Sequence, residues 1–318
     1  MSDSADGLFS PTMAAEFLDQ VYADLMRRPE TLDAALAALS WYLRTQRRKL
    51  ATPQWQHIVT LCLDHPLRQV LHQDPLTARA FSMSRGYQGD AELLDIIYGG
   101  DYKGFSADPV SALGAAVFSH TIRCQAPTAV RERRTFLAAQ IDMQCARLAS
   151  SHILSVACGH MRELELSTSV QARAFGRFAG LDQDPVTVNF VQNTWGQLGV
   201  ECKRESVKAL LTDDSPAESF DYIYTAGLYD YLDEPVAQGL TRKLFRMLRP
   251  RGRLLIGNYT PNTVDVGYME AYMGWNLLYR DASAMQNLAA MIPASSIGNR
   301  EVFSDTTGAV IYLSMEAQ

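Results

Sequence analysis

Cysteine is scarce in this chain and is not arranged for metal binding or cross-linking. The 318 residues include only five cysteines, an odd number, and no two of them are spaced as C-x-x-C. The sequence therefore predicts neither a disulfide framework nor a zinc knuckle. The six histidines form no H-x-x-x-H pair, and so we expect no structural metal. The cysteines are Cys62, Cys124, Cys145, Cys158 and Cys202.

Long apolar runs are also missing. No stretch approaches the ~18 residues that a membrane-spanning helix needs, and the longest run of small and apolar residues is 112–118. The first residues, MSDSADG, are acidic and lack the basic start and apolar stretch of a secretory signal. We therefore expect a cytoplasmic protein without a membrane span.

The chain has no excess of basic charge. It carries 29 Lys and Arg against 35 Asp and Glu, a net charge of -6. This balance argues against general binding to a nucleic-acid backbone, although a local basic pocket stays open. The composition, with 47% hydrophobic residues, 20 Gly and 13 Pro, excludes collagen-like, low-complexity and wholly disordered chains.

The first part of the chain shows helical spacing throughout. Apolar residues recur at helical intervals over 13–28 and again from Leu32 and from Pro53, with no strand-like alternation before about residue 150. We predict an N-terminal helical cap over residues 1–125. Within it, 84–100 is either a linker with a packed helix capped by Asp90 or a lid over a ligand.

From residue 151 the hydrophobic pattern changes and predicts strands, turns and helices in alternation. Short apolar strands alternate with helices, which predicts an α/β domain over 126–318 with a mostly parallel sheet and helices on both faces. The third, fifth and sixth strands are expected at 200–204, 253–259 and 301–304, and Asp184 is expected to cap a helix that begins at Pro185. The last two strands are joined by a short turn at Thr307-Gly308 and must be antiparallel. At about 150 residues per domain, two domains also suit the length.

The first strand of this domain ends in a glycine turn. In an open parallel sheet ligands bind at the carboxyl ends of the strands, so the turn from Ala157 to Glu163 marks a cofactor site. Asp182 follows Gly159 by about the ~20 residues expected of a carboxylate that accepts hydrogen bonds from both ribose hydroxyls.

Four segments of this half resemble the class I S-adenosylmethionine-dependent methyltransferases. They are VACG at 156–159, GLDQDP at 180–185, FDYIYTAGLYDYL at 220–232 and LFRMLRPRGRLLIGNY at 244–259. The resemblance implies a Rossmann-like, seven-stranded methyltransferase sheet whose last strand is antiparallel, with S-adenosyl-L-methionine as the cofactor. More narrowly, nearly the whole chain resembles a bacterial group that makes 3-hydroxypalmitic acid methyl ester. That likeness includes SRGYQGDAELLDIIYG, AVRERR and MEAYMGWNLLYR.

The resemblance also implies a set of cofactor-binding residues, but the turn departs from the family. Three alternate glycines of the family read Ala157, Gly159 and Met161 here, and Ser206 stands where an acidic residue often binds adenine. A missing third glycine counts more against a dinucleotide, whose pyrophosphate presses on the turn, than against S-adenosylmethionine. The expected cofactor contacts are Ala157, Cys158, Gly159, Glu163, Asp182, Gln183, Ser206, Val207, Thr225, Ala226 and Gly227.

Candidate residues for the chemistry depend on the methyl acceptor. A carboxylate is ionised at neutral pH and needs only an anchor, whereas a hydroxyl or amine needs a proton acceptor. Arg131, Arg134 and Arg280 are candidate anchors, although a charge run such as 131–134 is usually a solvated helix face, and an anchor there would need one arginine to turn inward. The candidate catalytic residues are His120, Asp230 and Glu270.

The segment after the fifth strand, 259–280, is rich in aromatic rings and thioethers. At helical spacing these side chains form either a protein core or the apolar wall of a substrate pocket. The expected substrate contacts are Tyr98, Arg131, Tyr229, Tyr259, Met269, Met273, Trp275 and Arg280.

Three functions remain open at this point. The first is methyl transfer to a carboxyl or hydroxyl oxygen of a small lipid-like or natural-product substrate. The second is an N-methyltransferase of secondary metabolism on the same fold. The third is a non-catalytic module that binds S-adenosylmethionine or a protein partner, which the eroded glycine turn favours. We expect a small-molecule partner and no nucleic acid, and a homodimer stays open.

Overall fold

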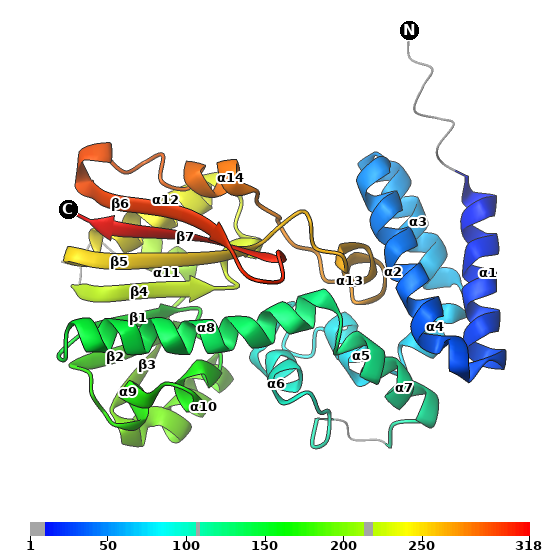
Figure 1. The fold of residues 1–318 in the computed structure, drawn as a ribbon, viewed down its shortest axis with the longest axis horizontal. Helices are drawn as coiled ribbons and strands as arrows, with labels where there is room; N and C mark the ends of the chain where they lie inside the picture. Colours follow the sequence, from blue (N-terminus) through cyan, green and yellow to red (C-terminus); the bar gives the residue numbers. More distant parts are fainter. Residues whose placement is uncertain (1–9, 106–108, 213–218) are drawn as a thin grey trace, which may run out of the picture. The chain divides into compact units, whose positions relative to one another are not determined.

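The computed structural model describes residues 10–105, 109–212 and 219–318 (Figure 1). The chain divides into two compact units. A helical unit comprises Met1–Val130 and Thr263–Asn276, and a sheet unit comprises Arg131–Asn262 and Leu277–Gln318. The compact units therefore divide at residue 130, and the helical unit also includes 263–276. The boundary at 125/126 between a cap and a catalytic domain remains a prediction.

The sheet unit is built on seven strands in the order β3-β2-β1-β4-β5-β7-β6. The first five in this order run parallel, and β7 is antiparallel to both of its neighbours. This confirms the predicted Rossmann-like sheet with an antiparallel last strand. The strands are β1 (His152–Val156), β2 (Arg177–Asp182), β3 (Val200–Arg204), β4 (Phe220–Ala226), β5 (Leu248–Tyr259), β6 (Ile297–Ser304) and β7 (Val310–Ala317).

Helices cover both faces of this sheet (Figure 1). One face packs with α11 (Val207–Thr212), α12 (Glu234–Arg246) and α14 (Ala282–Asn287) into a mainly aliphatic core. The other face carries α8 (Gln125–Arg147), α9 (Thr168–Gln171) and α10 (Pro185–Trp195). Three tyrosines on this second face, Tyr222, Tyr224 and Tyr312, are almost fully buried.

Local sequence signals explain where the helices of the sheet unit begin. Asp184 accepts a hydrogen bond from the backbone N–H of Val186, and Pro185 occupies the first turn of α10. Asp233 caps α12 in the same way through the N–H of Val236. These caps satisfy backbone donors that have no partner within the helix.

The helical unit contains the predicted succession of helices. They are α1 (Pro11–Arg27), α2 (Leu32–Lys49), α3 (Thr52–Asp64), α4 (Leu67–Leu71), α5 (Pro75–Ser82), α6 (Ala91–Gly99), α7 (Ala112–Thr121) and α13 (Val266–Tyr272). Asp90 caps α6 through the N–H groups of Glu92 and Leu93, as predicted for the segment 84–100. No helix among the described residues is long and apolar enough to cross a membrane.

Helix α13 is the most deeply packed element of the helical unit, because all seven of its residues are buried. It approaches α2 closely at Gly267, where an added Cβ would lie 2.5 Å from the backbone carbonyl carbon of Leu43. Glu270 on the same helix accepts hydrogen bonds from Arg47 (2.7 Å) and Trp55 (2.6 Å). Only glycine at 267 leaves room for the α2 backbone.

We predict that Gly267→Ala destabilises the protein by about 2–3 kcal/mol, because the new methyl group would overlap backbone atoms of α2. The midpoint of urea-induced unfolding, followed by circular dichroism, measures the loss. Gly239→Ala is the matched control. Its Cβ would lie 3.7 Å from Leu211, and alanine in α12 should add about 0.5–1 kcal/mol. A neutral Gly267→Ala would contradict the close approach.

Candidate functional site

The turn after β1 has the backbone of a three-glycine turn although only one of the three residues is glycine. Ala157, Gly159 and Met161 all adopt left-handed conformations, with φ of 52°, 54° and 50°. Residues with a Cβ avoid this region at a cost of about 1–2 kcal/mol. Strained backbone of this kind clusters at functional sites because the surrounding structure must hold it in place.

The bulk of Met161 is accommodated by a second glycine that lies on β2. Met161 is 1% exposed, and its Sδ lies 3.1 Å from the place that a Cβ of Gly180 would occupy. The Sγ of Cys158 lies 3.0 Å from the same place. The missing side chain at 180 therefore makes room for the two side chains of the turn.

Asp182, at the end of β2, holds the turn in place. Its Oδ2 accepts a hydrogen bond from the N–H of Gly159 (2.9 Å), and its Oδ1 accepts one from the N–H of Asp184 (3.0 Å). Burial raises the pKa of the Asp182 carboxyl, and the two backbone donors oppose that rise. Each carboxylate oxygen has a further lone pair, so this group can also accept hydrogen bonds from a ligand.

The end of β4 brings further polar groups to the same edge of the sheet. The hydroxyl oxygen of Thr225 is buried and has no hydrogen-bond partner among the residues that the structure describes. Gly227 follows with φ of 122°, and an added Cβ there would lie 3.4 Å from Nη1 of Arg133. A polar atom that is buried without a partner costs free energy, which fits a position meant for a ligand.

Arg133 is the arginine of α8 that turns inward. Arg133 is 5% exposed. Burial raises the pKa values of Glu163 and Asp230, and the positive charge of Arg133 partly opposes that rise. The inward arginine was one of the alternatives for the run 131–134, but the candidate anchors named from the sequence were its neighbours. The side chain of Arg134 instead binds the carbonyl oxygen of Arg162, and Arg131 is partly buried. Which of these neighbouring arginines is buried depends on which face of α8 packs against the sheet, and the sequence does not show that face.

Asp230, in the turn η5 (Tyr229–Tyr231) after β4, has the environment expected of a proton acceptor. Its carboxylate is buried and accepts a hydrogen bond from the N–H of Tyr259 (2.7 Å). Burial raises the pKa of Asp230 to about 6, and the Tyr259 N–H, Arg133 and Arg280 oppose the rise. A carboxyl group with such a pKa exchanges protons near neutral pH.

Arg280 holds the loop after β4 in place. Its guanidinium donates hydrogen bonds to the carbonyl oxygens of Tyr229 (2.6 Å) and Leu232 (2.6 Å) and to Oδ1 of Asn258 (2.8 Å). With these donors committed to the protein, the arrangement favours a positioning role over the predicted substrate anchor. Tyr229 is buried as well, and its hydroxyl pairs with Thr241 (2.9 Å) inside the core.

Other predicted residues of the sheet unit are held by neighbouring groups. The Glu163 carboxylate accepts a hydrogen bond from the Tyr224 hydroxyl (2.5 Å), and burial raises the pKa of Glu163. Ser206 caps α11 by accepting from the N–H of Ala209 (3.1 Å). Contact with Cys202 and burial raise the pKa of the Cys158 thiol, which disfavours a nucleophilic thiolate. Of the remaining predicted residues, Gln183 is exposed and Tyr259 is buried. Val207, Ala226 and Gly227 are partly buried.

The other predicted residues belong to the helical unit. The ring of His120 pairs with Asp33 (2.7 Å), and the Glu270 carboxylate is bound by Arg47 and Trp55, which favours structural roles for both. Tyr98 is partly buried. Met269, Met273 and Trp275 are buried, as the core alternative for 259–280 requires.

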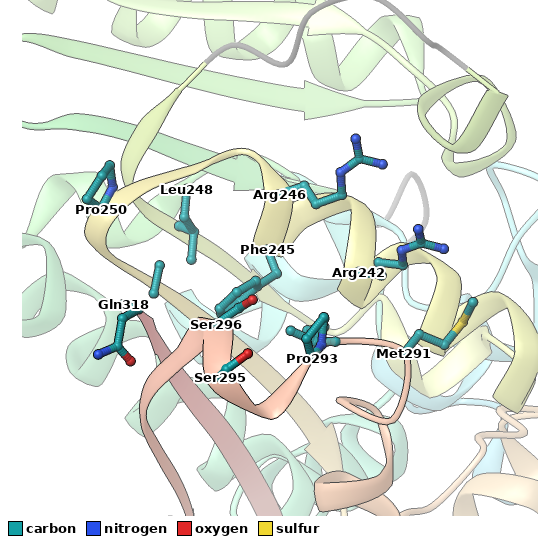
Figure 2. Close-up of a pocket in the computed structure, with 12 residues that line it drawn as sticks. Arg242, Phe245, Arg246, Leu248, Pro250, Met291, Pro293, Ser295, Ser296 and Gln318 are labelled. Carbon is teal, nitrogen blue, oxygen red and sulfur yellow. The ribbon is translucent and has the colours of Figure 1, made fainter.

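A pocket of about 610 Å³ lies at the opposite edge of the sheet, where β5 begins and α12 ends (Figure 2). Figure 2 shows Arg242 and Arg246 on α12 beside Phe245, with Pro293 on the segment after α14. None of the predicted site residues lines this pocket. Among the described residues, no group of three His, Cys, Asp or Glu side chains is placed to hold a metal ion.

No protein-family model matches the chain, and neither does any curated protein. Among solved structures, the chain is similar to a protein of Bordetella parapertussis described as a possible exported protein. The two share 15% identity over 96% of this chain and 98% of that one, with a TM-score of 0.58. At this identity the likeness establishes the fold and leaves the activity open.

Two further solved structures are similar over part of the chain. One is the N-methyltransferase NodS of Bradyrhizobium japonicum in complex with S-adenosyl-L-homocysteine, at 18% identity over 59% of this chain and 87% of that one, with a TM-score of 0.44. The other is the magnesium protoporphyrin IX methyltransferase of Synechocystis with the same ligand bound. It shows 10% identity over 71% of this chain and 98% of that one, with a TM-score of 0.46.

The elevated pKa of Asp230 predicts how stability depends on pH. Because the pKa is about 6 in the folded protein and 3.8 for a freely solvated aspartate, the protonated carboxyl favours folding. This contribution is present below pH 3.8 and is lost as the pH rises through 6. Relative to Asp230→Asn, which keeps the acceptor for Tyr259, the wild type should lose about 2–3 kcal/mol of unfolding free energy between pH 4 and pH 7. Parallel curves for the two proteins in urea titrations would contradict a raised pKa.

The left-handed conformation of Ala157 predicts an unusual effect of glycine. Ala157→Gly removes a Cβ that is strained and exposed, and we expect it to raise the free energy of unfolding by up to about 1 kcal/mol. Ala37→Gly, at an exposed position inside α2, is the control and should lower it by about 0.5–1 kcal/mol. Equal losses in thermal melts of both variants would show that Ala157 stores no strain.

Proposed function

We propose that this chain is a methyltransferase that uses S-adenosyl-L-methionine and acts on a small molecule. The observation that carries the proposal is the left-handed turn 157–161, held by the hydrogen bond between Gly159 and Asp182 at the carboxyl edge of a β3-β2-β1-β4-β5-β7-β6 sheet. Ligands of open parallel sheets bind at this edge.

The polar groups at this edge suit the parts of S-adenosylmethionine. Asp182 can accept hydrogen bonds from both ribose hydroxyls, because each of its oxygens has a free lone pair beyond the backbone contacts. Arg133, buried beside Gly227, has the charge to hold the carboxylate of the amino-acid part. Thr225 supplies a buried hydroxyl for which a ligand would be a partner. Val207 and Ser206, at the start of α11, follow β3 where adenine would lie.

The bound cofactor supplies a methyl group that is already activated by the sulfonium, so the protein contributes mainly alignment and exclusion of water. Asp230 is the proton acceptor that we assign for a hydroxyl acceptor, since its pKa of about 6 leaves it ionised at neutral pH. Arg280 positions the loop that carries Asp230 by binding the carbonyl oxygens of Tyr229 and Leu232.

The finer assignment is transfer to oxygen, in a carboxyl or hydroxyl group of a lipid-like substrate. It rests on the resemblance to the 3-hydroxypalmitic acid methyl ester synthases and on the buried carboxyl group of Asp230. A carboxylate acceptor would need no proton acceptor, and Asp230→Asn would then leave turnover unchanged.

Isothermal titration with S-adenosylmethionine tests the proposal. Asp182→Asn keeps the shape of the side chain but removes its charge and replaces one acceptor oxygen by an NH2 group, which cannot accept from a ribose hydroxyl or from the N–H of Gly159 or Asp184. We expect affinity to fall about 10–100-fold. Glu201→Gln makes the same charge change on the exposed side of β3, where Glu201 pairs with Arg177, and should bind like the wild type. Absence of binding to the wild-type protein at millimolar cofactor would overturn the methyltransferase assignment.

A further inference from the structure

Two sulfur atoms lie over the bare α-carbon of Gly180, and a third, that of Cys202, contacts one of them. The Sγ of Cys158 and the Sδ of Met161 lie 3.0 and 3.1 Å from the place that a Cβ would take there. Cys202 is the register partner of Gly180 on β3, and its Sγ lies 3.8 Å from that of Cys158. All three side chains are buried, at no more than 9% exposure.

The spacing of the two thiols is that of ligands around one metal ion. Metal–sulfur bonds of about 2.3 Å place two sulfur ligands about 3.8–4.0 Å apart in tetrahedral or trigonal geometry. The distance of 3.8 Å between Cys158 and Cys202 falls in this range, so an ion could bind both without a large movement of either side chain.

The kind of donor selects the kind of ion. Two thiolates and a thioether form a soft ligand set, which suits Cu(I) and Zn²⁺ and disfavours Mg²⁺ and Ca²⁺. Zinc would need a fourth nitrogen or sulfur ligand, and the nearest ring in the sequence, that of His160, is stacked on Phe190 at 3.8 Å between centroids. Three sulfurs alone suit a three-coordinate monovalent ion.

We propose that Cys158, Met161 and Cys202 form a Cu(I) site beneath the turn 157–161. The ion would bind both cysteines as thiolates, and the two thiol protons would pass to the solvent with no change of oxidation state. An occupied site would link the turn after β1 to β3 across Gly180. The proposal does not depend on the methyltransferase assignment, because it concerns the buried underside of the turn.

The test is an anaerobic titration of the reduced full chain with Cu(I) in competition with bathocuproine disulfonate. We expect one equivalent of Cu(I) per chain, with affinity reduced at least 100-fold in Cys158→Ala and Cys202→Ala and about tenfold in Met161→Leu. Cys62→Ala and Cys145→Ala remove buried thiols elsewhere and should bind like the wild type. Unchanged affinity in Cys158→Ala or Cys202→Ala would overturn the site.

A second measurement covers the case in which a cysteine variant does not fold. X-ray absorption at the copper edge of the loaded wild type should show three sulfur ligands at about 2.2–2.3 Å. Nitrogen or oxygen ligands, or no copper retained against the competitor, would overturn the proposal. Binding of S-adenosylmethionine by the same preparation is measured separately by calorimetry, so the copper site and the methyltransferase assignment can fail independently.

Discussion

The turn at the carboxyl edge of the sheet depends on one hydrogen bond, from the N–H of Gly159 to the carboxylate of Asp182. It joins the end of β1 to the end of β2 and holds a turn in which two residues with side chains are forced into the left-handed region. The contact is partly buried, with Asp182 8% exposed, so loss of the hydrogen bond would leave the carboxylate poorly solvated and would cost free energy. Gly180 on β2 supports the same turn, because its missing Cβ leaves the space that the side chains of the turn fill. The groups that we assign to the carboxyl edge, from Thr225 to Asp230, lie at the end of β4, the strand that pairs with β1, and in the turn η5 that follows it.

Much of the fold could be predicted from local patterns. The strand β3 begins and ends where the apolar pattern indicated, and Asp184 and Asp90 cap the helices that they were expected to cap. Two strands were predicted to begin four or five residues too late: β5 begins at Leu248 and β6 at Ile297, whereas the patterns indicated 253 and 301. The first residues of both strands are exposed or partly buried and lie next to register shifts. Strand pairing there rests on backbone hydrogen bonds, so the side chains show no apolar alternation that a sequence pattern could reveal.

The candidate site was predicted less completely. Asp182 and Asp230 lie at the edge where they were expected, because parallel strands that follow one another must end at the same edge. The roles of Arg280 and Glu270 could not be foreseen, since their partners lie up to 223 residues away in the chain. Arg133 was passed over in favour of its neighbours for the same reason.

Composition and spacing by themselves determined the order of helices and strands, the direction of the last strand and the location of the glycine turn after the first strand. These properties follow from periodicity, capping and chain connectivity, which act over a few residues. Only the tertiary structure decided which arginine of α8 is buried, which polar side chains are committed to backbone groups, and that the sulfurs of Cys158 and Met161 lie over Gly180 with Cys202 against Cys158. Those outcomes depend on contacts between distant segments, and a linear pattern does not encode which of several similar side chains the folded core will enclose.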